Sequence, residues 1–457
     1  MSAGVSGGLL RGRRSASAPQ DEVAGAACEG HEGDVAGIRR AIPTRRHVLA
    51  AAAASLAFPR PALAQTAPKV VVIGGGFGGA TAARALKEGG IDVTLVEANA
   101  TYVACPFSNE VIAGLQPMAA QRFGYEGIAR AGIRVVHAAA TGIDGAARRV
   151  TLADGTTLAY DRLVLSPGID LRFDAIPGYD EAAVEAMPHA WKAGAQTELL
   201  ERQLVAMPDG GTVVLSVPGN PYRCPPGPYE RASLIAHVLK TRKPRAKLIV
   251  LDAKDTFSKQ RLFQQAWSQL YPNQLEYVPL ASGGQVTAVD PAAMTVKTDF
   301  SEYKADVACI IPPQRAGRIA GLAGIADRSG WCPIDPVTFE SRLVPGIHVI
   351  GDAAIAGAMP KSAFSANAQG KVCALAVIDL LAGRALDDPR LINTCYSLVA
   401  PGYGISIAGV YRPANGVLTD IEGAGGVSPL DAPASFREQE ALHAADWYRT
   451  ITRQVFG

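Results

Sequence analysis

The amino-acid sequence predicts an α/β fold with two Rossmann-like halves, followed by a smaller C-terminal α+β region. Two observations predict this fold. Residues 69–97 read as strand, glycine-rich turn, helix and strand, which is the order of a βαβ unit. Residues 211–217 and 246–251 form a second pair of short apolar strands, as expected for a second parallel sheet.

The first unit carries the residues that a dinucleotide site needs. The β-branched run Lys69–Ile73 is followed at once by glycines and an alanine-rich helix. In such a turn Gly74 permits the tight bend, Gly76 lets the backbone approach a pyrophosphate, and Gly79 lets helix and strand pack closely. The helix N-terminus favours the phosphate charge. Glu97 ends the next strand, where an acid binds a ribose hydroxyl.

The composition excludes several classes of protein. Hydrophobic residues make up 48% of the chain and charged residues 19%, which is typical of a globular protein and excludes a disordered one. The net charge is only +2, so we expect neither a nucleic acid nor a charged membrane surface as partner. Seven cysteines are too few for a disulfide scaffold of this length, but they allow one redox pair.

The start of the chain resembles an export signal. Arg45 and Arg46 precede the apolar run 48–58, and the small residues 62–64 resemble a cleavage site. The apolar run is too short for a transmembrane helix, and we expect no membrane span in the chain. The arginine pair is typical of twin-arginine export, which predicts a periplasmic protein that has lost residues 1–64. Residues 1–43 are long for such a leader, so either they form an extension or translation starts later.

Two later segments indicate which dinucleotide binds. Residues 158–168 resemble a strand and turn found in two-dinucleotide-binding-domain flavoproteins, and this turn ends at Gly168. Residues 346–353 resemble the strand of the same superfamily that ends in Gly351 and Asp352, where the aspartate binds the ribityl chain of FAD. The resemblance therefore implies FAD as the cofactor.

The second half lacks a phosphate-binding turn. Between its first two strands the sequence has the loop 218–228, which contains five prolines. Proline has no N–H group and fixes φ, so this loop cannot cradle a pyrophosphate in the usual way. We expect the half to keep its fold with a degenerate nicotinamide site.

The cysteines separate into inert and candidate reactive residues. Cys28 lies in the leader, and the apolar surroundings of Cys309 and Cys373 are typical of inert buried thiols. The remaining candidates are Cys105, Cys224, Cys332 and Cys395. None forms a CxxC or CxxCH motif, so we expect no metal site and no haem c on this chain.

The segments around these candidates resemble one family. The chain is similar to the flavoprotein subunit of flavocytochrome c sulfide dehydrogenase, including the related flavoproteins of sulfur oxidation, over essentially all of residues 65–457. The most specific matching segments are Cys105-Pro106, 224–231, 360–367, 395–397, 403–406 and 445–457.

The resemblance implies a role for each site residue. Cys105 is expected to bond covalently to the flavin, and Lys361 to contribute to cofactor binding. Cys224 and Cys395 are expected to form a redox disulfide beside the flavin, with Glu230 as the nearby acid/base. Two alternatives stay open: Cys332, which follows Trp331, is a rival partner for Cys224, and Glu230 could be a solvated acid at a helix start.

The activity implied is oxidation of sulfide to sulfur or polysulfide. A disulfide offers an electrophilic sulfur to hydrosulfide, and the electrons then pass through FAD to a c-type cytochrome subunit that carries haem c on a separate chain. A sulfide:quinone reductase is the nearest alternative enzyme. An accessory flavoprotein that binds and restores a sulfur-carrier protein is an alternative of another class. An NADH-dependent disulfide reductase is disfavoured because residues 218–228 lack a phosphate loop.

We therefore expect five regions. They are an N-terminal extension and signal (1–64), the first part of the FAD-binding domain (65–185), the second Rossmann-like domain (186–315), the second part of the FAD-binding domain (316–385) and a C-terminal region near the flavin and the partner (386–457). The C-terminal end is amphipathic at helical spacing, and we expect its apolar side to pack in the core. That side consists of Phe436, Leu442, Ala445, Trp447, Ile451 and Phe456.

Overall fold

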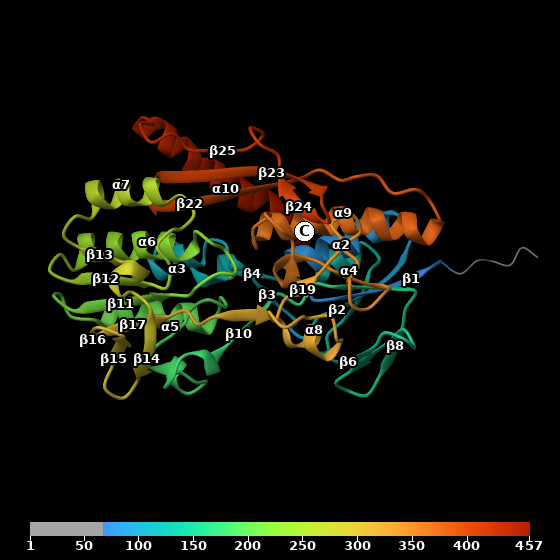
Figure 1. Cartoon of the computed structure of the whole chain (residues 1–457), viewed down its shortest axis with the longest axis horizontal. Coiled ribbons are helices and arrows are strands. Elements are labelled where there is room, and N and C mark those ends of the chain that lie inside the picture. The colour runs from blue at the N-terminus through green and yellow to red at the C-terminus, as the bar shows by residue number, and fades with distance from the viewer. Residues whose placement is uncertain (1–66) are drawn as a thin grey trace, which may run out of the picture. The chain divides into compact units, whose positions relative to one another are not determined.

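Figure 1 shows a computed structural model of the chain, and the structure describes residues 67–457. The expected export signal and Cys28 lie outside the described residues. The first half is built on a five-stranded parallel sheet. In spatial order its strands are β20 (Ile347–Val349), β9 (Arg162–Leu165), β1 (Lys69–Ile73), β2 (Asp92–Val96) and β5 (Arg134–Val136).

The glycine turn joins β1 to helix α2 (Phe77–Glu88). Gly74 has φ +95°, and a Cβ there would lie 2.2 Å from the carbonyl oxygen of Ser166. A Cβ on Gly79 would lie 1.9 Å from the carbonyl oxygen of Gly74. Only glycine fits at these two positions, so the turn and the first helical turn pack as the sequence predicts.

Helix α9 (Ala363–Ala382) packs against α2 over the first sheet (Figure 1). The two helices approach closely at Gly370, where a Cβ would lie 2.6 Å from the carbonyl oxygen of Gly78. Ser362 caps the start of α9 by accepting a hydrogen bond from the Ser365 N–H at 3.0 Å. Gly383, with φ +66°, ends the helix.

The second half is a four-stranded parallel sheet whose order is β13 (Leu275–Val278), β12 (Lys247–Asp252), β11 (Thr212–Val217) and β17 (Val307–Ile310). Its helices are α5 (Ala195–Ala206), α6 (Gly227–Arg242) and α7 (Gln260–Leu270). At the carboxyl end of β12, the Tyr229 hydroxyl donates to Asp252 at 2.6 Å, and the Tyr229 ring stacks on Phe257 at 3.5 Å. Asp252 is therefore bonded within the protein, which gives a physical reason to expect weak nicotinamide binding.

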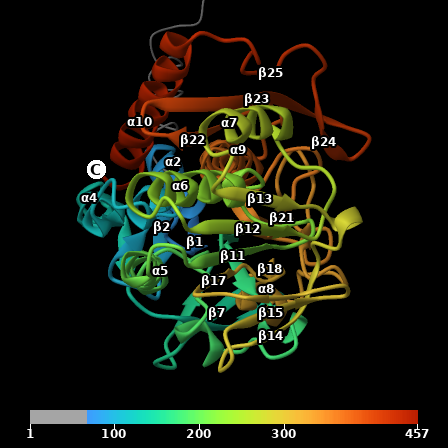
Figure 2. The ribbon, with the colours of Figure 1, turned by 90° about the vertical axis from the view of Figure 1, so that its left-hand side faces the viewer.

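The C-terminal region is an antiparallel sheet with a long helix, and it stands out in red in Figures 1 and 2. Its elements are β22 (Leu391–Ala400), β23 (Tyr403–Ala414), β24 (Val417–Asp420), β25 (Gly426–Val427) and helix α10 (Ala434–Phe456). Helix α10 crosses β23 closely, since a Cβ on Gly404 would lie 2.5 Å from the backbone nitrogen of Ala441. The α/β fold with two Rossmann-like halves and a C-terminal α+β region is thus confirmed.

Shorter elements complete the described chain. The remaining strands are β3 (Tyr102–Val103), β4 (Arg122–Phe123), β6 (Ala140–Asp144), β7 (Arg149–Leu152), β8 (Thr157–Ala159), β10 (Ile169–Leu171), β14 (Val286–Asp290), β15 (Thr295–Thr298), β16 (Glu302–Lys304), β18 (Gln314–Ala316), β19 (Cys332–Pro333) and β21 (Ala354–Ile355). The short helices are α3 (Ser108–Ile112), α4 (Glu126–Arg130) and α8 (Arg318–Leu322), with 3-10 turns η2 (Met118–Gln121), η3 (Phe173–Ala175), η4 (Ala183–Glu185), η5 (Leu280–Ser282) and η6 (Gly351–Ala353). None of the helices in the described part has the length and hydropathy that a membrane span requires.

The buried face of α10 differs from the expectation. Phe436 and Leu442 are 40% and 53% exposed, and Ala445 is exposed too, so the expected core packing of these three residues is wrong. The helix instead buries Arg437 and Glu440, which form an ion pair at 3.5 Å, and Ser406 and Ser428 both donate to Glu440 at 2.6 Å. Because a polar network occupies this core, a search for apolar periodicity misses the buried face.

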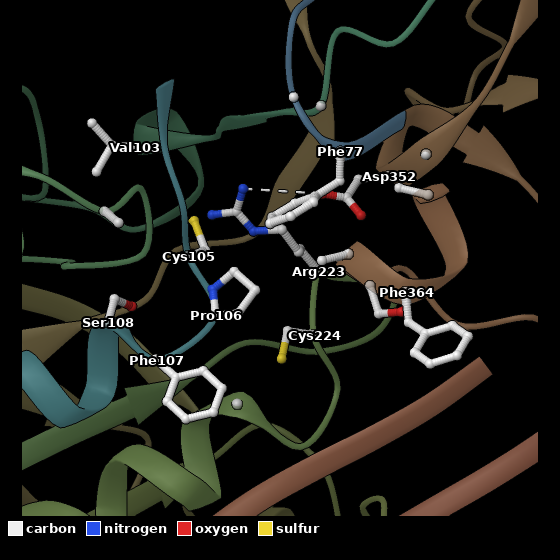
Figure 3. Close-up of a pocket in the computed structure, with 18 of the residues that line it drawn as sticks. Phe77, Val103, Cys105, Pro106, Phe107, Ser108, Arg223, Cys224, Asp352 and Phe364 are labelled. Atoms are coloured by element: carbon white, nitrogen blue, oxygen red, sulfur yellow. Dashed lines mark ion pairs between the residues drawn. The ribbon is translucent and has the colours of Figure 1, made fainter. Parts of the chain in front are cut away.

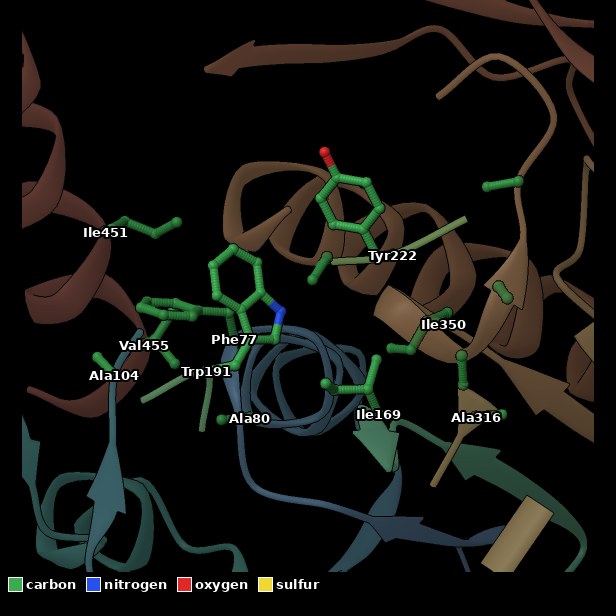
Figure 4. Packing of buried hydrophobic residues seen from close by; sticks show 14 of the residues in the cluster. Phe77, Ala80, Ala104, Ile169, Trp191, Tyr222, Ala316, Ile350, Ile451 and Val455 are labelled. Atoms are coloured by element: carbon green, nitrogen blue, oxygen red, sulfur yellow. The ribbon is translucent and has the colours of Figure 1, made fainter. Parts of the chain in front are cut away.

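The apolar end of α10 does reach the core. Figure 4 shows Ile451 and Val455 beside Phe77 of α2. The ring centroids of Phe77 and Phe456 are 5.8 Å apart. The C-terminal helix thereby joins the core of the first half and holds the C-terminal sheet over the site.

Candidate functional site

One cavity, of about 550 Å³, collects the candidate residues. Its walls come from the β1–α2 turn, the loop before α3, the proline loop before α6, η6 and strand β22. The predicted site residues that line it are Gly74, Gly76, Glu97, Cys105, Gly168, Cys224, Glu230, Gly351, Asp352 and Cys395. Residues from all three parts of the fold thus meet in one place.

The end of the cavity at the glycine turn is built as a cradle. Glu97 fixes the turn, because its carboxylate accepts hydrogen bonds from the Gly75 N–H at 2.8 Å and from the Asn99 N–H at 2.9 Å. A Cβ on Gly76 would lie 3.2 Å from the Tyr102 ring, so a side chain here would crowd the cavity wall. The start of α2 presents its first backbone N–H groups nearby. These features fit the pyrophosphate and ribose of a dinucleotide.

A buried ion pair lies further along the cavity. Arg223 and Asp352 approach to 4.0 Å (Figure 3), and burial raises the pKa of Asp352, while the Arg223 and Lys361 charges oppose this. The indole N–H of Trp191, which also lines the cavity, is buried and has no hydrogen-bond partner in the described part of the chain. An unpaired buried donor and a buried aspartate fit a polar group held here, as FAD would provide.

Two predicted cofactor residues do not line the cavity. Gly79 packs against Gly74, in the role that the sequence predicts. The ammonium of Lys361 donates to the carbonyl oxygens of Asp352 at 2.7 Å and of Ala354 at 2.8 Å, and lies 3.9 Å from the centroid of the Trp331 ring. Since these groups hold the ammonium and Lys361 does not line the cavity, Lys361 positions the backbone at Asp352.

Cys105 precedes a strained turn. Phe107 has φ +65°, and the Ser108 N–H donates to the carbonyl oxygen of Cys105 at 3.1 Å at the start of α3. The Cys105 thiol points into the cavity beside Arg223 (Figure 3). It is half-buried and 3.7 Å from the carbonyl oxygen of Trp191.

Cys224 and Cys395 line the same cavity from two different elements, the loop before α6 and strand β22. Cys224 has φ +56° in the loop before α6, and its N–H donates to the carbonyl oxygen of Lys361 at 2.7 Å. Cys395 lies on β22, and the Asn393 amide donates to its sulfur at 3.2 Å. Both are free thiols in the structure, so the predicted disulfide stays a prediction. Burial raises the pKa of each thiol.

The rival partner Cys332 lies elsewhere. It is a buried free thiol on β19, which pairs with β21, and it does not line the cavity. Burial raises its pKa to about 12. Of the two candidates, only Cys395 shares the cavity with Cys224, so the structure favours Cys395 as the partner.

Glu230 faces the cavity from the first turn of α6 and is not a solvated acid. Its carboxylate accepts hydrogen bonds from the Leu398 N–H at 2.8 Å and from the Asn109 amide at 3.1 Å. Burial raises its pKa, and these donors partly oppose the rise. Burial and the Glu230 charge also raise the pKa of neighbouring Glu110 to about 8. A carboxyl with a raised pKa suits proton transfer near neutral pH.

Sequence reasoning did not single out several cavity residues. Arg223 and Arg231 line the cavity, and Arg231 is almost fully buried, with its guanidinium donating to the carbonyl oxygens of His189 at 2.9 Å and Ala190 at 2.6 Å. The only local signal was their position: Arg223 directly precedes the matching segment 224–231, and Arg231 ends it. The contribution of Trp191 had no sequence signal, since it comes from a loop far away in the chain.

The family model described as sulfide dehydrogenase [flavocytochrome c] flavoprotein chain, central, matches residues 197–312. The model for the flavin-binding region of flavocytochrome c sulphide dehydrogenase matches residues 387–456, and a model for pyridine nucleotide-disulphide oxidoreductases matches residues 68–211. The flavoprotein chain of sulfide dehydrogenase [flavocytochrome c] from Chlorobaculum thiosulfatiphilum is 56% identical over 45 residues, which are 9% of this chain and 94% of that sequence.

The chain belongs to this flavoprotein family. It is an FAD-dependent oxidoreductase, as the motifs predicted. The ferredoxin–NAD(+) reductase component of the biphenyl dioxygenase system of Paraburkholderia xenovorans is 34% identical over 123 residues, which are 26% of this chain and only 30% of that reductase. The solved structure of the sulfide:quinone oxidoreductase of Aquifex aeolicus has a TM-score of 0.67 at 17% identity, and the match covers 85% of this chain and 92% of that one. This second likeness concerns the fold alone.

Proposed function

We propose that the chain is the flavoprotein of an exported sulfide dehydrogenase, which oxidises sulfide and passes the electrons to a c-type cytochrome subunit. The observation that carries the proposal is the shared cavity. Cys224, Cys395 and Glu230 line the same space as the glycine turn and Asp352, which fit FAD. A Cys224–Cys395 sulfur couple would therefore lie next to bound FAD.

The residues divide the chemistry as follows. Hydrosulfide attacks a Cys224–Cys395 disulfide, which leaves a persulfide on one cysteine and a thiolate on the other. A second hydrosulfide removes the outer sulfur as hydrodisulfide, and the disulfide re-forms with loss of two electrons and one proton. In this proposal Glu230 accepts that proton. Bound FAD supplies the two-electron oxidant, and Gly74, Glu97 and Asp352 would hold it.

Two further features belong to the proposal. A thioether from Cys105 would attach FAD covalently and prevent its loss outside the cytoplasm. Export of a folded, loaded protein agrees with the paired Arg45 and Arg46, and it would place the enzyme in the periplasm, where a partner chain carrying haem c accepts the electrons.

The acceptor is tested by turnover. Purified protein is mixed anaerobically with sulfide and with either cytochrome c or a soluble ubiquinone. We expect sulfide consumption with cytochrome c and little with the quinone. Turnover with quinone alone would favour a sulfide:quinone reductase. Negligible sulfide consumption with both acceptors would favour an accessory protein that restores a sulfur carrier.

A further inference from the structure

A buried lysine lies against the strand that carries Cys395. Lys259 precedes α7 and is only 7% exposed. Its ammonium donates to the carbonyl oxygen of Cys395 at 2.8 Å, to the hydroxyl of Ser397 at 2.8 Å and to the carbonyl oxygen of Ile405 at 3.3 Å. Cys395 and Ser397 are two residues apart on β22, so their side chains share a face of the strand, and both line the cavity.

The ammonium has no carboxylate within ion-pair distance in the part of the chain that the structure describes. Burying an ammonium without a paired charge lowers the stability of the fold, which indicates that Lys259 has a role other than stabilisation. The ionisable groups that act on it are all acids: Cys395 on β22, Glu230 on α6, Cys224 in the proline loop and Glu440 on α10. Strand β23 contributes the carbonyl oxygen of Ile405. Burial lowers the pKa of Lys259 to about 8, and these acids oppose the fall.

Lys259 is thus a cation placed where the sulfur pair would acquire negative charge. Opening a disulfide with two electrons and one proton yields one thiol and one thiolate. In a buried site the thiolate is disfavoured, and burial raises the pKa of both Cys224 and Cys395. A nearby ammonium offsets that cost without contacting the reacting atoms.

We propose that Lys259 is a positioning residue whose ammonium stabilises the thiolate formed when the Cys224–Cys395 pair opens. The inference rests on the proposed function, because it takes these two cysteines as the reactive pair. It assigns to α7, a helix of the second half, a role in the sulfur chemistry of the C-terminal strand β22.

Thiol reactivity tests this directly. The FAD-loaded protein is reduced with a phosphine and treated with iodoacetamide between pH 6 and 10, and alkylation of Cys224 and Cys395 is followed by mass spectrometry. In Lys259→Met we expect the midpoint of alkylation to move up by about one pH unit, a tenfold loss of thiolate at a given pH. Lys259→Arg keeps the charge and should keep the midpoint close to that of the unchanged protein. Lys247→Met, at an exposed lysine, is the matched control.

An unmoved midpoint in folded Lys259→Met or Lys259→Gln would overturn the proposal. If neither neutral variant folds, Lys259→Arg decides, because its charge does not titrate in this pH range. Its midpoint should lie at or below that of the unchanged protein, and a midpoint about one pH unit above it would contradict a stabilising cation. Sulfide is absent from the assay, so its outcome is separate from the proposed function. If sulfide cannot reduce the flavin but the midpoint still shifts in Lys259→Met, the proposed role of Lys259 stands and the proposed activity is wrong.

Discussion

Replacing Glu230 by glutamine should slow the oxidation of sulfide. The substitution keeps the shape of the side chain and removes its ability to take a proton. Loss of a general base costs about 10²- to 10⁴-fold in rate, and we expect kcat/KM for sulfide to fall by that factor near neutral pH. The acid limb of the pH profile, which reports Glu230 with its raised pKa, should disappear in the variant.

The local contacts predict little structural damage. The amide oxygen can still accept the Leu398 N–H, which is 2.8 Å from Glu230 in the unchanged protein. In the unchanged protein the Glu230 carboxylate accepts a hydrogen bond from the Asn109 side-chain N–H at 3.1 Å. In the variant the glutamine NH₂ group faces that N–H, and two donors cannot bond to each other. One hydrogen bond, worth about 1 kcal/mol, is therefore lost unless the Asn109 amide group rotates. Removing a buried charge offsets part of this loss.

The pH dependence of stability has a definite sign. The unfolded Glu230 carboxyl ionises near pH 4.3 or so, whereas burial raises its pKa in the folded state. Between these two values the unfolded state binds fewer protons, so the free energy of unfolding falls as the pH rises through this interval. Glu230→Gln should lack this contribution, and thermal unfolding at several pH values measures it.

The control is Glu438→Gln, an exposed glutamate on α10, which should change neither rate nor pH profile. Sulfide consumption is measured with cytochrome c as acceptor. A folded, FAD-loaded Glu230→Gln that keeps its rate and its acid limb would refute the assignment of the acid/base.

Three further predictions concern the site. Cys395→Ala should abolish reduction of the flavin by sulfide, whereas Cys332→Ala should leave it intact; the reverse result, seen in visible absorbance, would make Cys332 the partner. Cys105→Ala should release the flavin into the supernatant on acid precipitation, while the unchanged protein keeps it in the pellet; equal release from both would contradict a covalent bond. Gly79→Ala places a Cβ 1.9 Å from the carbonyl oxygen of Gly74. We therefore expect a free energy of unfolding lower by about 2–3 kcal/mol and a loss of bound FAD. A variant with an unchanged melting temperature and full FAD content would contradict this prediction.

The parts of the fold that local sequence determines were predictable. The turn at Gly74 and the strand pair at 211–217 and 246–251 follow from short-range patterns, and the structure contains them. The buried face of α10 was not predictable from apolar spacing, because Arg437 and Glu440 form its polar core.

Only the site residues that lie in recognisable sequence motifs were predictable. Cys224, Glu230 and Cys395 lie in segments that resemble the family, and they meet in one cavity. The role of Lys259 could not be predicted from local sequence, because Lys259 and its contact Cys395 are 136 positions apart in the chain. Lys361 lies in a matching segment, but its ammonium is held by the backbone carbonyls of Asp352 and Ala354.

The central claim is that sulfide reduces the flavin through the cysteine pair. The most direct measurement is rapid anaerobic mixing of the oxidised protein with micromolar sulfide while the visible flavin absorbance is followed. We expect rapid bleaching, loss of bleaching in Cys224→Ala, and recovery of the absorbance when cytochrome c is added. Bleaching that persists in Cys224→Ala, or a flavin that sulfide does not bleach in the unchanged protein, would contradict the account.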